Sequence, residues 1–352
     1  MMIEPRQLPV FAICGYSGSG KTTLIEKVIP ILRRKSLAVA VVKSDVHDLQ
    51  VDHPGKDSDR LFQAGADVFL NGPGEGFFRQ HRLKGVYTTD ELAAMSAHYD
   101  IILMEGYKDS SYRKVWLQDQ ANTSPPALTN LAATLPWDSD RQAVLLEILE
   151  KFLAEISNAT PIFGGVLIGG KSRRMGTPKH LLTIQGKTWL ENTIGLLKPL
   201  CQQVVILGQG EIPSALVEYN RLPDIPGTTG PLAGLLAGMR WAPQVSWLLV
   251  ACDHPALTSE ALQWLLTARK PGRWAIQPRH DDQSEIEPLL AWYDYRCRTL
   301  VEALVLQKNF RLASLSPHAL AFNPVIPINY KSAWKDRDYP NIESKTVRSP
   351  HF

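Results

Sequence analysis

The stretch with the clearest chemical potential is Gly15–Thr22, which reads GYSGSGKT and fits the pattern G-x-x-x-x-G-K-[ST]. It follows the apolar run Val10–Cys14 and precedes the helical pattern Thr23–Leu32. In a strand, loop and helix of this order, backbone N–H groups surround phosphate oxygens, the lysine reaches the β- and γ-phosphates, and the last hydroxyl ligates Mg²⁺. A turn that only joins a strand to a helix does not need a glycine, a lysine and a threonine in succession, as at Gly20, Lys21 and Thr22. The nucleotide-binding residues predicted here are Gly15, Gly18, Ser19, Gly20, Lys21, Thr22 and Thr23, with Thr22 also a metal ligand.

A strand that ends in an acid accompanies this loop. Residues Tyr99–Gly106 read YDIILMEG, a buried type of run whose last polar residue is Glu105. A carboxylate at the carboxyl end of such a strand orients a magnesium-bound water in many phosphate-binding proteins. Glu105 is therefore the predicted metal-side carboxylate of the first site, and the alternative is an acid that only caps the strand.

A second glycine-rich loop lies in the other half of the chain, where Gly165–Lys179 read GVLIGGKSRRMGTPK. Glycines let the main chain approach a base and its phosphates, while Arg174 and Lys179 offset charge on a triphosphate as pyrophosphate leaves. The strand Trp247–Asp253 again ends in an acid, and Asp253 is predicted to hold magnesium. This combination is typical of nucleotidyl transfer, in which an ionised phosphate attacks without a general base.

Both halves alternate short β-branched runs with helical patterns, which predicts an α/β protein of two doubly wound domains. Ligands of such parallel sheets bind at the carboxyl ends of the strands. The expected strands are Val10–Cys14, Ala38–Val42, Asp67–Leu70, Ile101–Met104 and Lys114–Leu117 in the first half, and Gly165–Ile168, Gln203–Leu207, Trp247–Ala251 and Trp274–Gln277 in the second.

The domain limits follow from a change in composition near residue 157. An amphipathic helix over Gln142–Ile156 is expected to close the first domain. The polar run Ser157–Pro161 has the composition of a linker. We therefore expect an N-terminal P-loop NTPase-like domain over 1–157, a C-terminal Rossmann-like nucleotidyltransferase domain over 161–335, and a polar tail over 336–352.

Composition narrows the class of protein further. The chain has 352 residues, 38 Lys+Arg against 35 Asp+Glu and four widely spaced cysteines, so no disulfide scaffold or structural zinc is expected. There is no signal-peptide pattern and no apolar run long enough for a membrane helix. No concentrated basic face or motif for nucleic acid accompanies the small positive charge. We expect a cytoplasmic protein with small-molecule substrates.

The first half resembles the adaptor (B) protein family of molybdopterin-guanine dinucleotide biosynthesis. The resemblance rests on GYSGSGKTTL, on VDHPGKDSDRLFQAGA (Val51–Ala66) and on DIILMEGYK (Asp100–Lys108), and covers about residues 8–120. It implies a GTP-binding adaptor domain with weak or no GTPase activity that forms homodimers. It also implies that Lys56, Asp57 and Ser58 lie near the nucleotide or a partner surface. The sequence departs from the family pattern at residues 43–48 and after Gln118, and these departures argue against hydrolysis of GTP.

The second half resembles the molybdenum cofactor guanylyltransferases. The matching elements are LIGGKSRRMGTPK (167–179), GPLAG (230–234), ACDHP (251–255), EPLLAWY (287–293) and PINYKSAW (327–334). The resemblance implies Mg²⁺-dependent transfer of GMP from GTP to molybdopterin. The residues it assigns are Leu167, Gly169, Gly170, Arg174 and Lys179 in the GTP loop, Asp253 at the metal, Asp224 at the guanine edge, Gly230 and Pro231 at the floor near base and ribose, and Asn329 at the metal or pterin phosphate.

Two of these assignments keep an alternative. Asp224 also fits a loop acid that caps a turn, and Asn329 also fits a plain strand-end asparagine. Three positions depart from the family pattern: Ile168 before the glycine pair, Pro178 in TPK, and Pro327 in place of the first asparagine of Asn-x-Asn.

The resulting hypothesis is a fusion of a GTP-binding adaptor with a molybdenum cofactor guanylyltransferase. It implies delivery of the product to a molybdoenzyme or a cofactor-insertion partner. One rival is CTP-dependent cytidylyl transfer to molybdopterin; the pair Gly169–Gly170 and the GPLAG stretch favour guanine, whereas Ile168 weakens that argument. Another rival is a non-catalytic, GTP-regulated adaptor for cofactor delivery, which Pro327 favours.

Overall fold

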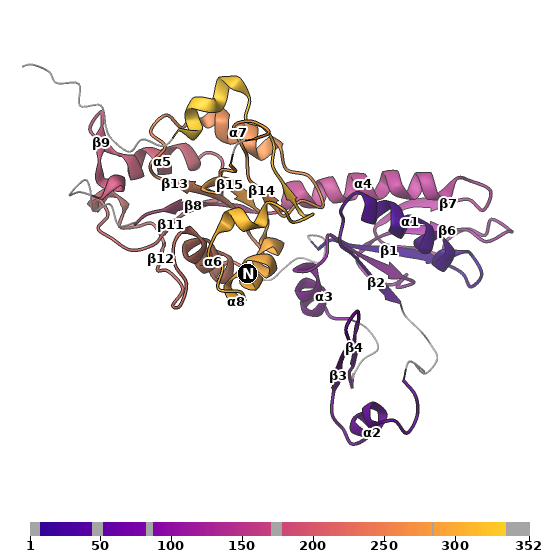
Figure 1. Ribbon diagram of the computed structural model, residues 1–352. Coiled ribbons are helices and arrows are strands. Elements are labelled where there is room, and N and C mark those ends of the chain that lie inside the picture. Colours follow the sequence, from indigo (N-terminus) through magenta and orange to yellow (C-terminus); the bar gives the residue numbers. More distant parts are fainter. Residues whose placement is uncertain (1–7, 44–51, 82–86, 170–177, 284, 336–352) are drawn as a thin grey trace, which may run out of the picture. The chain divides into compact units, whose positions relative to one another are not determined.

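The structure is a computed structural model that describes residues 8–43, 52–81, 87–169, 178–283 and 285–335. The chain divides into two compact units, Met1–Arg34 with Ala38–Leu153, and Lys35–Leu37 with Ala154–Phe352. Figure 1 shows both. The second division falls inside helix α4, Arg141–Ala159, and the limits 157 and 161 stay a prediction. No described helix is long and apolar enough to cross a membrane.

Helix α4 extends further than the sequence indicated. Ser157 was expected to begin the linker, yet the helix continues through Ala159. Ser, Asn and Ala in the last turn cost a helix little, whereas proline lacks the N–H that would continue it. The stop signal is therefore Pro161, and the next strand begins directly after it at Ile162.

Five parallel strands form the sheet of the first unit in the order β2-β5-β1-β6-β7. The two central strands, β1 and β5, are almost wholly buried, as the near-continuous apolar sequence of a sheet covered on both faces requires. Helix α3 packs on one face through Leu92, and α4 packs on the other through the contact of Phe152 with Phe11. The element bounds are β1 Val10–Gly15, α1 Lys21–Arg34, β2 Val39–Lys43, α3 Thr89–Ser96, β5 Ile101–Glu105, β6 Arg113–Leu117 and β7 Leu131–Leu135.

Strand β7 was not predicted from the sequence. Its residues LAATL contain one β-branched side chain, and all but Leu135 are exposed or half-buried because β7 is the edge strand. The hydrogen bonds that make it a strand come from β6. An alanine-rich edge strand therefore carries little of the apolar pattern by which strands are recognised.

The expected strand Asp67–Leu70 exists but does not join the parallel sheet. Strand β3, Val68–Asn71, pairs antiparallel with β4, Gly76–Arg79, and with no other described strand. Only four residues connect them, and so short a connection can join only antiparallel strands. With helix α2, Asp57–Gln63, the hairpin forms a small unit that we call the arm, residues 52–81.

The second unit contains a seven-stranded sheet in the order β12-β11-β8-β13-β15-β14-β16. Helices α5 and α7 pack on one face, where Leu248 and Val250 belong to a large apolar cluster. Helix α6 lies against the other face, at Trp247. The bounds are β8 Ile162–Leu167, β9 Thr183–Ile184, β10 Lys187–Thr188, α5 Trp189–Leu197, β11 Gln203–Leu207, β12 Arg221–Leu222, α6 Pro231–Trp241, β13 Ser246–Ala251, α7 Ser259–Thr267, β14 Ala275–Ile276, β15 Leu290–Tyr293, α8 Arg298–Leu306 and β16 Ala321–Phe322.

Strand β15 is the reversed strand of this sheet. It pairs antiparallel with both β13 and β14, whereas the other described pairings are parallel. The sequence indicated a wholly parallel sheet and no strand at Leu290–Tyr293. Its residues LAWY are all buried and lack β-branching, so they also resemble a buried helical turn.

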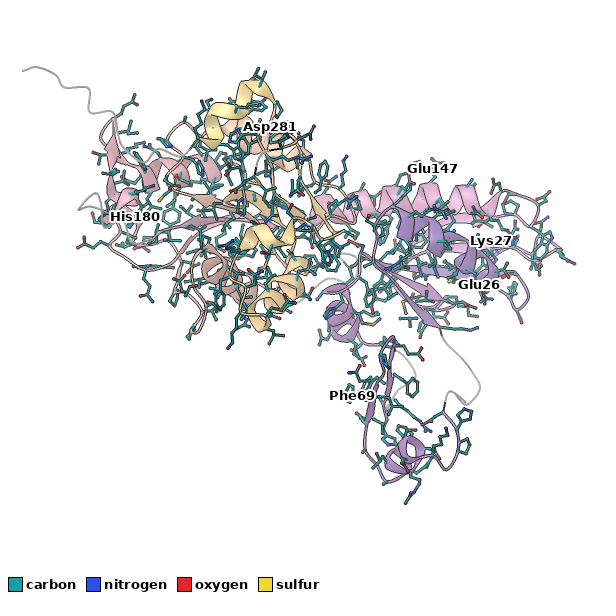
Figure 2. All side chains as sticks on the ribbon, in the orientation of Figure 1. Glu26, Lys27, Phe69, Glu147, His180 and Asp281 are labelled. Carbon is teal, nitrogen blue, oxygen red and sulfur yellow. The ribbon has the colours of Figure 1, made fainter. Side chains whose placement is uncertain are left out.

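Apolar side chains fill the interiors, and charged ones line the outer helical faces. Glu26 and Lys27 on α1 and Glu147 on α4 are exposed, and Figure 2 labels them on the outside of the ribbon. One close packing position depends on glycine: a Cβ on Gly238 would lie 2.8–3.0 Å from the ring atoms of the fully buried Trp247. Position 238 of α6 therefore requires glycine, because Trp247 of the sheet occupies the space that a Cβ would need.

Candidate nucleotide-binding sites

The P-loop of the first unit leaves β1 and enters α1, as its spacing indicates. Lys21 Nζ donates to the carbonyl oxygens of Gly15 at 3.1 Å and Tyr16 at 2.9 Å, so the ammonium lies over the loop. Gly15 allows a close approach: a Cβ there would lie 2.4 Å from Ser19 Oγ and 2.6 Å from the oxygen of Leu117. The loop thus presents backbone N–H groups and a cation to one point at the start of α1.

Glu105 and Thr22 meet at this point. The Thr22 hydroxyl donates to Glu105 Oε1 at 2.7 Å, and Lys43 Nζ lies 3.8 Å from the same oxygen. A hydroxyl and a carboxylate are oxygen ligands of the kind that Mg²⁺ accepts beside phosphates. The structure therefore brings together the two residues that the sequence assigned to a metal, although they are 83 positions apart.

Arg141, which the sequence did not single out, contacts the P-loop. Its guanidinium donates to the oxygens of Ser19 at 2.9 Å and Gln118 at 2.5 Å, and its Nε donates to Pro136 at 2.7 Å. Desolvation lowers the pKa of Arg141 from its usual value. The sequence does contain one indication of this role. Arg141 is the first residue of a helix, where the positive end of the helix dipole disfavours a cation, so a contact elsewhere is expected to compensate.

Lys179 and Asp253 form the centre of the second site. Lys179 Nζ lies 3.2 Å from Asp253 Oδ2, and both side chains are about a quarter exposed, at 23% and 26%. Lys179 begins a short 3₁₀ segment, Lys179–Leu181, and Asp253 follows β13. A half-buried ammonium beside a carboxylate at the carboxyl end of a parallel strand is suited to a triphosphate and its cation. Gly170 and Arg174 lie outside the described residues.

The residues assigned to the base of the nucleotide are neighbours in the structure. A Cβ on Gly234 would lie 2.9 Å from Leu167 Cδ2 and 3.8 Å from Asp224 Oδ1. Gly230 has φ +71° and precedes Pro231, the first residue of α6. Desolvation raises the pKa of the Asp224 carboxyl, as expected beside apolar groups. Asp224 therefore lies against the GPLAG helix, beside the glycine-loop strand β8.

Gly169 has φ +102°, a conformation that favours glycine at the end of β8. Asn329 is exposed and lies in the 3₁₀ segment Ile328–Trp334 rather than at the end of a strand. The plain strand-end interpretation of Asn329 is therefore wrong, and its role at the metal or pterin phosphate stays a prediction.

The reversed strand β15 adds polar groups to the same edge of the second sheet. The N–H of Ala251 donates to Leu289, so the segment before β15 lies beside the end of β13. In that segment Glu287 lies 3.5 Å from His280 Nε2. His280 was not predicted from the sequence, because its contact with Glu287 depends on how the segment before β15 folds.

A cavity of about 300 Å³ borders Cys252 and His254, the two neighbours of Asp253 in sequence. Burial raises the pKa of the Cys252 thiol to about 12, so this side chain is a neutral core group near neutral pH. Among the described residues, no group of three or more His, Cys, Asp or Glu side chains could hold a metal. The predicted metal-side carboxylate is Glu105 in the first site and Asp253 in the second, and a single carboxylate fits Mg²⁺ bound largely through substrate phosphates.

Two family comparisons match the two units. Residues 10–135 match the family described as molybdopterin guanine dinucleotide synthesis protein B, and residues 164–318 match the MobA-like NTP transferase domain. The chain belongs to both families. It is a fusion of a B domain and a MobA-like nucleotidyltransferase domain, and the α/β architecture of both units agrees with this assignment.

Individual relatives agree with the fusion. A molybdopterin-guanine dinucleotide biosynthesis adapter protein of Haemophilus influenzae is 36% identical over 149 residues, 40% of this chain and 83% of that protein. A probable molybdenum cofactor guanylyltransferase of Pelotomaculum thermopropionicum is 30% identical over 183 residues, 51% of this chain and 83% of that protein. A molybdenum cofactor biosynthesis bifunctional protein of Synechocystis is 33% identical over 145 residues, 40% of this chain and 41% of that protein.

Proposed function

We propose that the MobA-like domain transfers GMP from Mg-GTP to molybdopterin, and that the B domain binds a second guanine nucleotide through its P-loop. The observation that carries the transfer is the Lys179–Asp253 pair at 3.2 Å, at the carboxyl end of the strand beside the glycine-loop strand. The relatives named as molybdenum cofactor guanylyltransferases support GTP and molybdopterin as the substrates.

The arrangement supports an in-line displacement. An oxygen of the terminal phosphate of molybdopterin attacks the α-phosphorus of GTP, and the bond to the β-phosphate oxygen breaks, so pyrophosphate leaves with the electron pair. Lys179, with Arg174, offsets the charge that develops on the leaving group. Asp253 would hold Mg²⁺, which would withdraw charge from the phosphates. Asp224 accepts from the donor edge of guanine.

Pyrophosphate release by the full chain tests this proposal. The protein is incubated with molybdopterin, Mg²⁺ and either GTP or CTP, and the dinucleotide product is identified by mass. Release with GTP alone supports guanylyl transfer. Release with CTP alone would instead establish cytidylyl transfer, and no release with either nucleotide would favour the non-catalytic adaptor.

Asp253→Asn is the variant for this assay. We expect a fall in kcat of roughly 100-fold or more, because loss of a metal-bound carboxylate removes several kcal/mol of transition-state stabilisation. Glu302→Gln is the matched control, since Glu302 on α8 forms an exposed ion pair with Arg240 on α6 and its loss should leave turnover unchanged. Unchanged turnover in Asp253→Asn with an intact fold would contradict the proposed role.

The B domain is further proposed to form a homodimer through the arm. Phe69 and Phe78 stack with their centroids 4.0 Å apart and are 76% and 46% exposed, and Leu70, the next residue of β3, is 43% exposed. Among the described strands, β3 and β4 pair only with each other, so each presents an edge to which a second copy of the chain could bind. Exposed aromatic side chains beside open strand edges are characteristic of protein interfaces.

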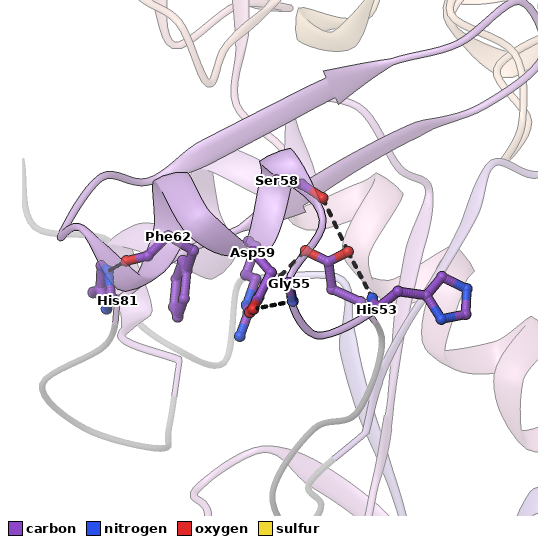
Figure 3. A network of polar contacts seen from close by, with 8 residues as sticks. His53, Gly55, Ser58, Asp59, Phe62 and His81 are labelled. Atoms are coloured by element: carbon purple, nitrogen blue, oxygen red, sulfur yellow. Dashed lines mark hydrogen bonds and ion pairs between the residues drawn. The ribbon is translucent and has the colours of Figure 1, made fainter.

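A polar network supports the shape of the arm (Figure 3). Asp52 accepts from His53 N–H and Ser58, and Arg79 bonds both Asp52 and Asp59. Hydrogen bonds from Gly55 and Arg79 lower the pKa of Asp59, so this carboxylate stays ionised near neutral pH. Polar residues of the adaptor motif VDHPGKDSDRLFQAGA therefore bond to one another, whereas Lys56 and Asp57 of the same motif are exposed and available to a partner.

Size-exclusion chromatography with light scattering tests the dimer. The double variant Phe69→Ser, Phe78→Ser should elute as a monomer, whereas Leu306→Ser, which removes an 86% exposed leucine from α8, should not change the mass. A wild-type monomer, or a double variant that remains dimeric, would overturn this part of the proposal. Delivery of the product to a molybdoenzyme or insertion partner in the cytoplasm completes the proposed function.

A further inference from the structure

The P-loop motif accounts for the phosphates of a nucleotide in the B domain, but no motif assigns the residues that contact its base. Two loops leave the carboxyl ends of β6, which pairs with β1, and of β7, which pairs with β6. They are the β6 loop, Gln118–Thr123, and the β7 loop, Pro136–Asp140. Because ligands of a parallel sheet bind outside the carboxyl ends of its strands, these loops border the nucleotide site.

The direction of a bound nucleotide follows from the position of Glu105. Strand β5, which ends at Glu105, pairs with one side of β1, and β6 pairs with the other side. The hydrogen bond between Thr22 and Glu105 places the metal and the γ-phosphate on the β5 side. The ribose and base therefore extend the other way, across β1 toward the β6 and β7 loops.

Arg141 joins both loops to the P-loop. It donates to Ser19 of the P-loop, to Gln118 of the β6 loop and to Pro136 of the β7 loop, and a further bond of 3.3 Å reaches Leu135. Guanidinium is a rigid planar fork, so one arginine fixes several carbonyl oxygens relative to one another. The spacing between the phosphate-binding loop and the two base-side loops is thus set by a single side chain.

The two loops also hold each other. The N–H of Trp137 donates to Asn122 Oδ1 at 3.0 Å, and the N–H of Gln118 donates to Leu135 at 3.1 Å. The Gln118 side chain donates to the oxygen of Asn122 at 2.6 Å. The indole of Trp137, 37% exposed, lies with its centroid 5.0 Å from the Arg141 guanidinium. The β6 and β7 loops, Gln118–Thr123 and Pro136–Asp140, are therefore fixed relative to each other, and Trp137 is a partly exposed aromatic side chain on them. We call these two loops the platform.

Asp119 is the hydrogen-bonding group of this platform. Thr123 donates to both of its carboxylate oxygens, from N–H and hydroxyl, each at 2.9 Å. These two bonds lower the pKa of Asp119, so it is ionised near neutral pH. Each oxygen retains a lone pair for another donor. Guanine presents two adjacent donors, N1–H and the 2-amino group, whereas adenine presents an acceptor at N1.

We propose that the β6 and β7 loops, positioned by Arg141, form the base-binding end of the B-domain site, and that Asp119 selects guanine by accepting from N1–H and the 2-amino group. This inference rests on the proposed nucleotide binding by the B domain. It assigns the base contact to a part of the chain that neither glycine-rich loop includes.

The test is isothermal titration of the full chain with GTP, ATP and xanthosine triphosphate. The MobA-like domain also binds GTP in the proposed function, so the binding that Lys21→Ala removes defines the B-domain site. In Asp119→Asn, the asparagine can accept from N1–H but meets the 2-amino group with its own donor. We expect GTP affinity at this site to fall by about tenfold or more, the usual effect of one mismatched polar contact.

The same variant should gain affinity for xanthosine triphosphate. Xanthine has an oxygen in place of the 2-amino group, so asparagine pairs with it through one acceptor and one donor. ATP binding should not change. Asp90→Asn is the matched control, because Asp90 is an exposed acid on α3, outside both loops, and it should keep the wild-type preference.

Two results distinguish a failure of the proposed nucleotide binding by the B domain from a failure of the proposed base selection by Asp119. If Lys21→Ala binds as many GTP molecules as the wild type, the proposed binding by the B domain is wrong and the inference falls with it. If Lys21→Ala loses one site but Asp119→Asn retains wild-type GTP affinity, or loses it without gaining xanthosine triphosphate, only the inference is overturned.

Discussion

The two domains use the same local design at their sites and differ in what surrounds it. In each, a strand leads into a glycine-rich loop, and the adjacent parallel strand ends in an acid: β5 beside β1 with Glu105, and β13 beside β8 with Asp253. The partner of the acid differs. Glu105 accepts from the hydroxyl of Thr22, whereas Asp253 pairs with the ammonium of Lys179.

The outer neighbours of the acid strands explain how the two sites diverge. In the B domain, β5 is followed by the parallel edge strand β2. In the MobA-like domain, β13 is followed by the reversed strand β15, which brings the segment with His280 and Glu287 to the same edge.

The largest expected effect is a difference between Lys179 and Lys21 in the rate of pyrophosphate release. Lys179→Ala should lower kcat for pyrophosphate release by roughly 100-fold or more, because it removes a cation that offsets charge on the leaving group. Lys21→Ala should leave that rate unchanged and abolish nucleotide binding by the B domain. Steady-state kinetics and titration calorimetry of both variants measure this. Equal loss of turnover in both would mean that the domains do not work as separate sites.

A medium effect is expected from Arg141→Lys. Lysine keeps the charge but cannot hold the oxygens of Ser19, Gln118 and Pro136 in one planar geometry. Affinity of the B-domain site for both GTP and ATP should fall by about tenfold, since charged hydrogen bonds are lost. The rate of guanylyl transfer should stay constant, and a fall in that rate alone would contradict the assignment of Arg141 to the first site.

The smallest effect concerns packing in the second domain. Gly238→Ala would place a methyl group 2.8–3.0 Å from the ring of Trp247, so we expect the domain to lose about 1–3 kcal/mol of stability. In calorimetry the unfolding transition of the MobA-like domain should move down by several degrees while that of the B domain does not move. Transitions that shift together would show that the two domains unfold as one unit.

Much of each site was predictable because its key residues are close in sequence or at the ends of recognisable strands. The P-loop spacing predicted the strand, loop and helix around Lys21, and the apolar runs before Glu105 and Asp253 placed both acids at strand ends. The pairing of Glu105 with Thr22 and of Asp253 with Lys179 follows once those strands lie beside the loop strands.

The amino-acid sequence by itself determined the two families, the two glycine-rich loops and the acids that face them, because these depend on local spacing and on runs of buried residues. Only the tertiary structure decided the role of Arg141, 122 residues from Ser19, and the reversal of β15. It also removed β3 from the main sheet and placed it in the arm. Strand direction and order depend on which distant segments pair, and short apolar runs such as LAWY or VFLN fit more than one partner.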